Sequence, residues 1–130
     1  MAITIVGDLS RTWYSDRDLL LEVLVQSWEE DPDLRVVVHG AAGFDVFVIQ
    51  WVEGMGVPVI SFGPKKLEDR FHWKAPPGQV LENCELLLVL PRRGKKKDVW
   101  EVDPVTIEAA LALDIPVLAM DEEGRMKSWP

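Results

Sequence analysis

The chain has 130 residues, of which 48% are hydrophobic, and 22 acidic against 14 basic side chains give a formal net charge of −8 at pH 7. This length suits a single domain over residues 1–130 that buries roughly two thirds of its unfolded surface, and the composition excludes an intrinsically disordered chain. No apolar run approaches the ~20 residues that a membrane span needs. The acidic balance argues against duplex nucleic-acid binding by the whole surface.

The cysteine and histidine content is low. Cys84 is the only cysteine, which excludes an internal disulfide and fits a reducing compartment. Neither Cys84 nor the two histidines, His39 and His72, have a spacing typical of a metal site. Residues 2–6 are predicted to form a strand directly, with no preceding basic segment or cleavage site, so we expect no signal peptide. We therefore expect a cytoplasmic protein with no membrane partner.

Predicted strands and helices alternate along the chain. Residues 2–6 are apolar on both faces, as expected of a central parallel strand. Ser15, with Asp18 three residues later, resembles a capping box and predicts a helix that runs to about Glu30. The remaining pattern predicts strands at 34–39, 57–62, 85–90 and 115–120, and helices at 45–53 and from Asp103-Pro104 to about 113. The helix over 45–53 is apolar nearly all round, so it should be heavily buried.

This alternation predicts a Rossmann-like three-layer α/β sandwich with a five-stranded, mainly parallel sheet in the order 3-2-1-4-5. Pro58 favours an edge position for the third strand, and the continuous apolar run of the fourth favours a central one. Residues 63–79 are not assigned with precision, although 65–73 could form a short helix. Residues 121–130 are expected to be a loosely held tail, in which Met126 and Trp129 could dock a last short segment.

The most informative stretch is RVVVHGAAGFD at residues 35–45, in which a strand, a tight turn and a helix start follow each other. Such a turn brings backbone N–H groups and the positive end of a helix to one point, which suits an anion. Gly40 and Gly43 can adopt positive φ and let a ligand approach the backbone. The alternative is an ordinary strand-to-helix turn, with Asp45 as its N-cap and His39 as a satisfied, partly buried side chain.

A basic segment, Arg92-Arg93-Gly94-Lys95-Lys96-Lys97, follows the fourth predicted strand on an otherwise acidic chain. It suggests a local anion site, and the alternative is a solvated loop. Ligands of such sheets bind beyond the carboxyl ends of the strands, where strand order reverses. Three loops, at 7–13, 39–45 and 91–97, should therefore converge. We predict ligand-binding residues in all three, namely Gly7, Asp8, Ser10, Arg11, Gly40, Ala41, Ala42, Gly43, Asp45, Arg92, Arg93, Gly94 and Lys95.

Two of these residues carry specific expectations. Arg11 should be exposed and free to contact a phosphate. Asp8 could orient a ribose hydroxyl or stabilise the turn after the first strand. The six tryptophans are unusual for this length. Trp13 and Trp73 lie on predicted loops, where they could stack on a base or pack beneath the loops; core-like positions are predicted for Trp28, Trp51 and Trp100.

Three segments together resemble the SLOG superfamily of small Rossmann-like proteins. They are Gly-Asp-Leu-Ser-Arg at 7–11, Val-Val-His-Gly-Ala-Ala-Gly-Phe-Asp at 37–45 and Gly-Val-Pro-Val at 56–59. This superfamily includes LOG-type phosphoribohydrolases and DprA-like domains, and the resemblance is closest to its short, uncharacterised members, over about residues 3–120. It implies a nucleotide or nucleotide-derived ligand at Gly7, Gly40, Gly43 and the loop after the fourth strand.

The chain departs from the LOG-type pattern in the loop after the fourth predicted strand. Those enzymes carry P-G-G-x-G-T-x-x-E there, whereas this chain has Pro-Arg-Arg-Gly-Lys-Lys-Lys-Asp at 91–98, with no glutamate in register. We therefore expect a protein that binds or senses a nucleotide-like small molecule, with no catalytic residue and no cofactor assigned. One alternative is an N-glycosidic-bond hydrolase or transferase using Asp8, Glu101 or Glu108.

A second alternative is a nucleic-acid or protein interaction module that uses the basic loop 92–97. Binding of this kind would depend steeply on salt. Nucleic acid is the less favoured partner because the chain as a whole is acidic. The apolar first and second helices could also supply the face of a homodimer.

Overall fold

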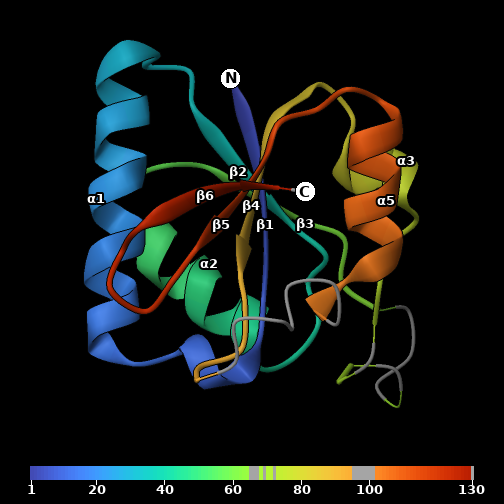
Figure 1. Cartoon of the computed structure of the whole chain (residues 1–130), viewed down its shortest axis with the longest axis horizontal. Helices are drawn as coiled ribbons and strands as arrows, with labels where there is room; N and C mark the ends of the chain where they lie inside the picture. The colour runs from blue at the N-terminus through green and yellow to red at the C-terminus, as the bar shows by residue number, and fades with distance from the viewer. Residues whose placement is uncertain (65–67, 69, 72, 95–101, 130) are drawn as a thin grey trace.

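The computed structural model describes residues 1–64, 68, 70–71, 73–94 and 102–129. Within them the strands form one sheet in the order β3-β2-β1-β4-β5-β6 (Figure 1). The strands are β1 (Ala2–Gly7), β2 (Arg35–Val38), β3 (Val59–Ser61), β4 (Cys84–Leu90), β5 (Val117–Met120) and β6 (Met126–Trp129). The first five are parallel, which confirms the predicted order, the Rossmann-like α/β class and the edge position of β3.

Helices cover both faces of the sheet. They are α1 (Tyr14–Glu30), α2 (Phe44–Gly54), α3 (Pro77–Val80) and α5 (Pro104–Ala112), with a short 3-10 helix, η1, at Leu9–Arg11. In Figure 1, α1 and α2 lie on one side of the strands and α3 and α5 on the other. None of the helices among the described residues has the length and apolar character needed to cross a bilayer.

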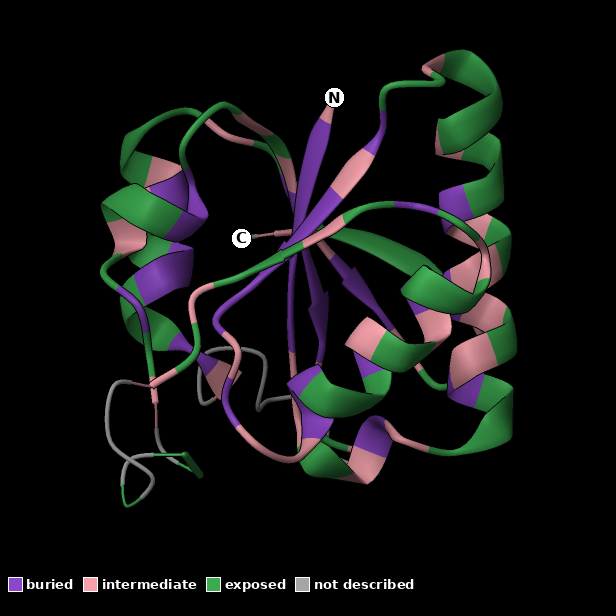
Figure 2. Cartoon of the chain, turned by 180° about the vertical axis from the view of Figure 1, so that it is seen from behind, coloured by how far each residue is buried: buried purple, intermediate pink, exposed green. Residues whose placement is uncertain are grey.

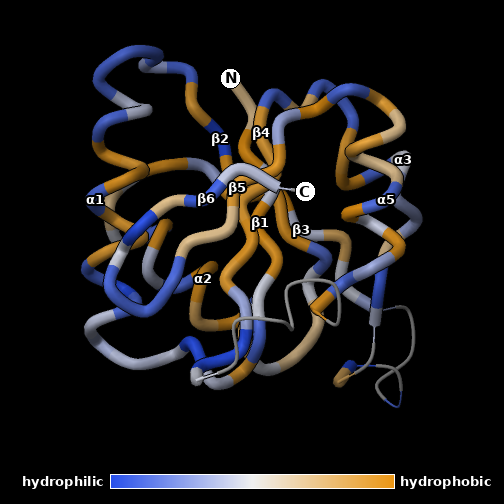
Figure 3. The backbone as a smooth tube through the Cα atoms, viewed as in Figure 1, coloured by the Kyte–Doolittle hydropathy of each residue, from blue (hydrophilic) through white to orange (hydrophobic). Residues whose placement is uncertain are grey.

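Two hydrophobic layers hold these helices on the sheet. One joins Leu20 of α1 and Val48 of α2 to the face of β1 that carries Ile5. The other joins Val80 of α3 and Ile107 of α5 to the opposite face. The two edge strands, β3 and β6, are mostly exposed, whereas β1, β2, β4 and β5 are buried and apolar along most of their length (Figures 2 and 3). This double burial explains why their sequences are continuous apolar runs and do not alternate.

The pairing of β1 places three loops at one edge of the sheet. β1 is parallel to β2 on one side and to β4 on the other, with Thr4 opposite Val37 and Gly7 opposite Leu90. The first residue after β1 continues this pairing, because the amide of Asp8 donates to the carbonyl of Leu90 at 3.0 Å. The segments that follow β1, β2 and β4 therefore begin at the same edge, where a ligand would be expected.

The sheet has a sixth strand, so the prediction of five was one short. Residues 121–130 were expected to be loose, yet Met126–Trp129 pairs antiparallel with β5. The Asp121 carboxylate forms the turn between them by accepting from the amides of Glu123 and Arg125 at 2.9 and 2.8 Å. The docking of Met126 and Trp129 is confirmed. The sequence did not predict β6 as a strand because four residues with two polar ones at the centre show no clear hydrophobic periodicity.

Of two helix starts predicted from the sequence, one is wrong and the other is confirmed. The predicted Ser15–Asp18 capping box is wrong, because α1 begins at Tyr14 and the carboxylate of Asp16 accepts from the amide of Trp13 at 3.1 Å. The predicted start of α5 is confirmed. The carboxylate of Asp103 accepts from the amide of Thr106 at 3.2 Å, and a proline occupies the first helical position.

Several side chains are more exposed than the sequence predicted. Val46 and Phe47 of α2 are 41% and 38% exposed, so this helix is not buried all round, and Trp28 is 36% exposed at the outer side of α1. Trp51 is partly buried against the first hydrophobic layer, as expected. Trp100 lies outside the described residues, as does most of the short helix considered at 65–73.

Candidate functional site

A pocket of about 330 Å³ lies beyond the carboxyl ends of β1 and β2. It is lined by residues of the segments after these strands and by two side chains from a third segment, namely Gly7, Asp8, Leu9, Ala41, Ala42, Gly43, Phe44, Asp45, Phe71 and Lys74. Six of the predicted site residues are therefore together. Phe71 and Lys74 were not predicted, because the segment that carries them has no periodic pattern in the sequence.

The turn between β2 and α2 is held by Asp45. Its carboxylate accepts from the backbone N–H groups of Gly40 at 3.0 Å and Ala41 at 3.1 Å. The predicted N-cap role of Asp45 is therefore wrong: Gly43 is the N-cap, with φ of 91° and no capping side chain, and Asp45 lies inside the first turn of α2. The amide of Ala42 donates to the carbonyl of Arg70. Three amides of the turn thus already have acceptors within the protein.

Burial acts on the Asp45 carboxyl. Desolvation raises its pKa above the ordinary value of 3.8, against the hydrogen bonds from Gly40 and Ala41 and the positive charge of Lys74, which lower it. The raised pKa means that the fold disfavours the charged form of Asp45 despite the two amides. The carboxyl is consequently poised to gain a proton at higher pH than an exposed aspartate does.

Two glycines at this edge are required by packing. A Cβ on Gly40, whose φ is 97°, would lie 2.3 Å from Oγ of Ser61 and 2.6 Å from the amide nitrogen of Gly63. A Cβ on Gly7 would lie 2.4 Å from the ring of Phe44. Protein atoms thus fill the space beside both positions. Glycine is required because Ser61 and Gly63 approach Gly40 closely and Phe44 of α2 approaches Gly7 closely.

Asp8 stabilises the turn after β1, which was one of its two expected roles. Its carboxylate accepts from the amide of Ser10 at 2.9 Å and caps η1. The same residue lines the pocket. Of the two other carboxylates considered for catalysis, Glu108 is exposed on α5 and Glu101 lies outside the described residues.

His39, at the end of β2, is buried and bonded through both ring nitrogens. Nδ1 lies 2.9 Å from the amide nitrogen of Ala75, and Nε2 lies 2.7 Å from Oδ2 of Asp103 and 3.3 Å from Oγ1 of Thr106. A backbone N–H can only donate, so Nδ1 is the acceptor and the neutral ring carries its hydrogen on Nε2. The expectation of a satisfied histidine is confirmed, and it is more deeply buried than expected.

Asp103 links this histidine to the lysine of the pocket. Its Oδ2 accepts from His39 and lies 3.7 Å from Nζ of Lys74, whose side chain is half exposed. Burial raises the pKa of Asp103, but the hydrogen bond from His39, the charge of Lys74 and the hydrogen bond from Thr106 together lower it below 3.8. Asp103 is therefore a carboxylate at neutral pH, and it attracts the ammonium of Lys74.

Arg11 is buried, so the prediction that it is exposed to a phosphate was wrong. Its Nε donates to Oδ1 of Asp16 at 2.7 Å, and its terminal nitrogens donate to the carbonyls of Met120 at 2.7 Å, Asp121 at 2.8 Å and Pro91 at 3.2 Å. Only 1% of its surface is exposed. Arg11 thus ties together the segments after β1, β4 and β5.

Arg93 joins the first and third loops to each other. Its amide and Nε donate to Oγ and the carbonyl of Ser10 at 3.0 and 3.1 Å. Its terminal nitrogens lie 2.7 Å from Oδ2 of Asp16 and 3.0 Å from Oε2 of Glu122, and its guanidinium stacks on Trp13, 3.8 Å from the ring centre. Carboxylates therefore compensate the charge of Arg93, and one face of the Trp13 ring is already covered.

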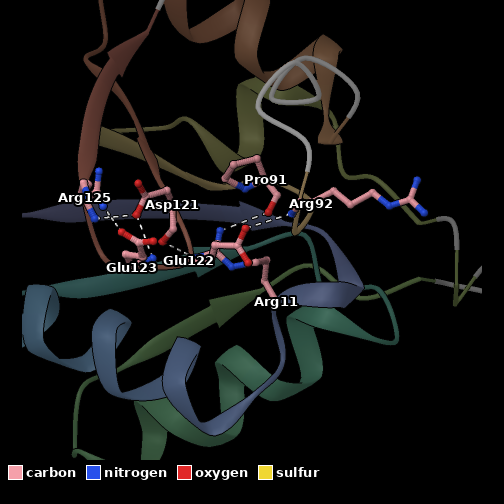
Figure 4. A pocket seen from close by; sticks show the side chains of 8 residues that line it. Arg11, Pro91, Arg92, Asp121, Glu122, Glu123 and Arg125 are labelled. Atoms are coloured by element: carbon pink, nitrogen blue, oxygen red, sulfur yellow. Dashed lines mark hydrogen bonds and ion pairs between the residues drawn. The ribbon is translucent and has the colours of Figure 1, made fainter.

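The rest of the described basic loop faces a second pocket, of about 300 Å³ (Figure 4). This pocket is lined by Arg11, Pro91, Arg92, Gly94, Asp121, Glu122, Glu123 and Arg125. Figure 4 shows Arg92 extended away from the acidic side chains of the β5–β6 turn. The three loops were expected to converge on one site, but they line two separate pockets. The segments after β1 and β2 share one pocket, and Arg92 and Gly94 line the other. Lys95 lies outside the described residues.

No group of three or more histidine, cysteine, aspartate or glutamate side chains suited to a metal ion occurs among the described residues. Trp73, considered as a stacking residue, is packed against the second hydrophobic layer.

In comparisons with known proteins, no family model, curated protein or solved structure matches the chain.

Proposed function

We propose that the protein binds a nucleotide or a nucleotide-derived small molecule in the pocket beyond β1 and β2. The observation that carries the proposal is the meeting of two positive features there. The amino terminus of α2 begins at Gly43 without a capping side chain, and Lys74, whose ammonium lies 3.7 Å from Oδ2 of Asp103, lines the same pocket. A helix amino terminus and a lysine together favour a phosphate group.

Phe71 supplies the third feature of the proposed site. Phe71 lines the pocket and is 65% exposed, and the guanidinium of Arg70 lies over one face of its ring, 5.0 Å from the ring centre, so a base could stack on the other face. The pocket volume of about 330 Å³ is near the lower end of the range for small-molecule sites, roughly 300–1,000 Å³. This size favours a mononucleotide over a dinucleotide. The resemblance to the SLOG superfamily supports the same class of ligand.

A thermal-shift panel tests this proposal. The panel contains AMP, GMP, cyclic AMP, cyclic GMP and ADP-ribose, with inorganic phosphate as the simple anion. A ligand at 100 times its Kd should add about 2.7 kcal/mol to the free energy of unfolding. Lys74→Gln should reduce the shift, and Lys127→Gln, an exposed lysine on β6, is the matched control. Equal shifts in both variants, or no shift with any compound, would exclude this site.

Hydrolysis or transfer at an N-glycosidic bond is a second candidate, favoured by one observation. Asp8 and Asp45 both line the pocket, and burial raises the pKa of Asp45. A carboxyl with a raised pKa can act as a general acid. Chromatography of nucleoside monophosphates after incubation would reveal free base, and Asp45→Asn, which keeps an acceptor for Gly40 and Ala41, should abolish its release.

The basic loop gives less support to a nucleic-acid module. Arg93 is bonded to Asp16 and Glu122, so its charge is compensated within the protein. Among the described cations of this loop, Arg92 is the exposed one. A single exposed arginine contributes little to an electrostatic footprint for a nucleic-acid backbone.

A further inference from the structure

We infer that His39 is a positioning residue for Lys74: its ring anchors the backbone at Ala75 and thereby holds the lysine at the pocket. The effect on ligand binding rests on the function proposed above, whereas the anchoring of the backbone does not. His39 itself is not one of the residues that line the pocket. It acts through the backbone of Ala75 and the neighbouring Lys74.

The geometry of His39 joins three segments of the chain. The ring extends from the end of β2, accepts from the amide of Ala75 through Nδ1, and donates to Asp103 at the start of α5 through Nε2. Ala75 is 2% exposed, so its amide has little access to water as a substitute acceptor. Lys74 precedes Ala75, and its Cα therefore lies one peptide, about 3.8 Å, from an anchored residue.

One tautomer of the ring satisfies both neighbours. In the other neutral tautomer, the hydrogen on Nδ1 would face the N–H of Ala75, and the lone pair of Nε2 would face the carboxylate of Asp103. Both contacts would be repulsive. In the neutral Nε2–H form the histidine adds no positive charge, so Lys74, 3.7 Å from the same carboxylate oxygen, is the nearby cation that balances Asp103. His39 thus fixes the backbone of the lysine and leaves Asp103 to attract its ammonium.

Two substitutions by amide side chains separate the two hydrogen bonds of the ring. The side-chain amide of asparagine reaches the position of Nδ1, so His39→Asn keeps an acceptor for Ala75 and loses the donor to Asp103. The longer amide of glutamine reaches the position of Nε2, so His39→Gln keeps the donor and loses the acceptor. Each variant loses one buried hydrogen bond, so both should be less stable than the native protein, and His39→Asn should lose more because the buried carboxylate of Asp103 loses its histidine donor.

Amide hydrogen exchange at Ala75 tests the anchoring in the protein without ligand. We expect exchange at this amide to be about tenfold faster in His39→Gln than in the native protein, and close to the native rate in His39→Asn. The dissociation constant for AMP should rise about tenfold in His39→Gln and be largely restored in His39→Asn. Equal exchange rates at Ala75 in the two variants would overturn the inference.

The outcomes distinguish the anchoring from the proposed function. If Ala75 behaves as expected but AMP and inorganic phosphate bind none of the three proteins, the anchoring stands and the proposed ligand class fails. Should both variants unfold, ¹⁵N spectra of the imidazole in the native protein decide the matter. A proton on Nε2 with a bare Nδ1 supports the inference, and a proton on Nδ1 at neutral pH overturns it.

Discussion

Arg11 and Asp16 form a buried ion pair, with 2.7 Å between Nε and Oδ1 and at most 1% of either side chain exposed. The pair would cost stability if its remaining polar atoms were unpaired. Arg11 also donates to the carbonyls of Met120 and Asp121, and Asp16 also accepts from Arg93. The pair is therefore the centre of a network that joins the segments after β1, β4 and β5 at the edge of the sheet where ligands are expected.

Arg11→Met should destabilise the fold strongly. It leaves the buried carboxylate of Asp16 with only one of its two arginine partners and removes the donors to three backbone carbonyls, for an expected loss of about 3–5 kcal/mol. Urea denaturation measures this loss. The control is Arg17→Met, which breaks the exposed Arg17–Asp18 pair and should cost less than about 1 kcal/mol. Similar losses for both variants would contradict the structural role of Arg11.

Gly40→Ala should disrupt the turn between β2 and α2. The new Cβ would lie 2.6 Å from the backbone nitrogen of Gly63, and the positive φ of 97° disfavours any side chain, so we expect a loss of more than about 2 kcal/mol. The matched control is Gly54→Ala at the end of α2. No atom lies within 4 Å of a Cβ there, and alanine should be neutral or stabilising by up to about 1 kcal/mol. Thermal denaturation of the two variants gives the comparison.

Asp103 and Asp45 should shift the pH dependence of stability in opposite directions. The pKa of Asp103 is lowered in the folded protein, so its carboxylate contributes stability above the ordinary value of 3.8. That contribution is lost as the pH falls through the lowered pKa. The advantage of the native protein over Asp103→Asn, measured by denaturant titration between pH 7 and pH 3, should therefore shrink at the acidic end. Asparagine retains the capability to cap α5.

For Asp45 the sign is reversed. Its pKa is raised in the folded protein, so its contribution is fully present below 3.8 and is lost as the pH rises through the raised value. Relative to Asp45→Asn, the native protein should lose stability between pH 3.5 and pH 7. Asparagine retains one acceptor oxygen for Gly40 and Ala41. A difference that stays constant over this range would show that the folded environment does not perturb this carboxyl.

The sheet could be predicted from the sequence because its five parallel strands have strong local signals. Apolar runs, Pro58 and the Asp103-Pro104 pair each indicate an element or its place without knowledge of distant residues. β6 could not be recognised, since Met126–Trp129 is short and has a polar centre.

The candidate site was only partly predictable. The turn at 40–45 has a local signature, and the structure places it at a pocket. The burial of Arg11 depends on carbonyls at Met120 and Asp121, more than 100 residues away in the sequence, and no local pattern reports them. Lys74 was missed for a similar reason. Its position depends on the hydrogen bond from the amide of Ala75 to the ring of His39, and these two residues are far apart in the chain.

The location of the bound ligand tests the central claim most directly. A titration of ¹⁵N-labelled protein with AMP, followed by amide chemical shifts, compares the two pockets in one experiment. We predict that the largest saturable shifts occur at Gly43, Phe44 and Lys74, with small changes at Gly94 and Glu122. Shifts concentrated at Gly94 and Glu122, or no saturable shifts anywhere, would contradict the proposed site.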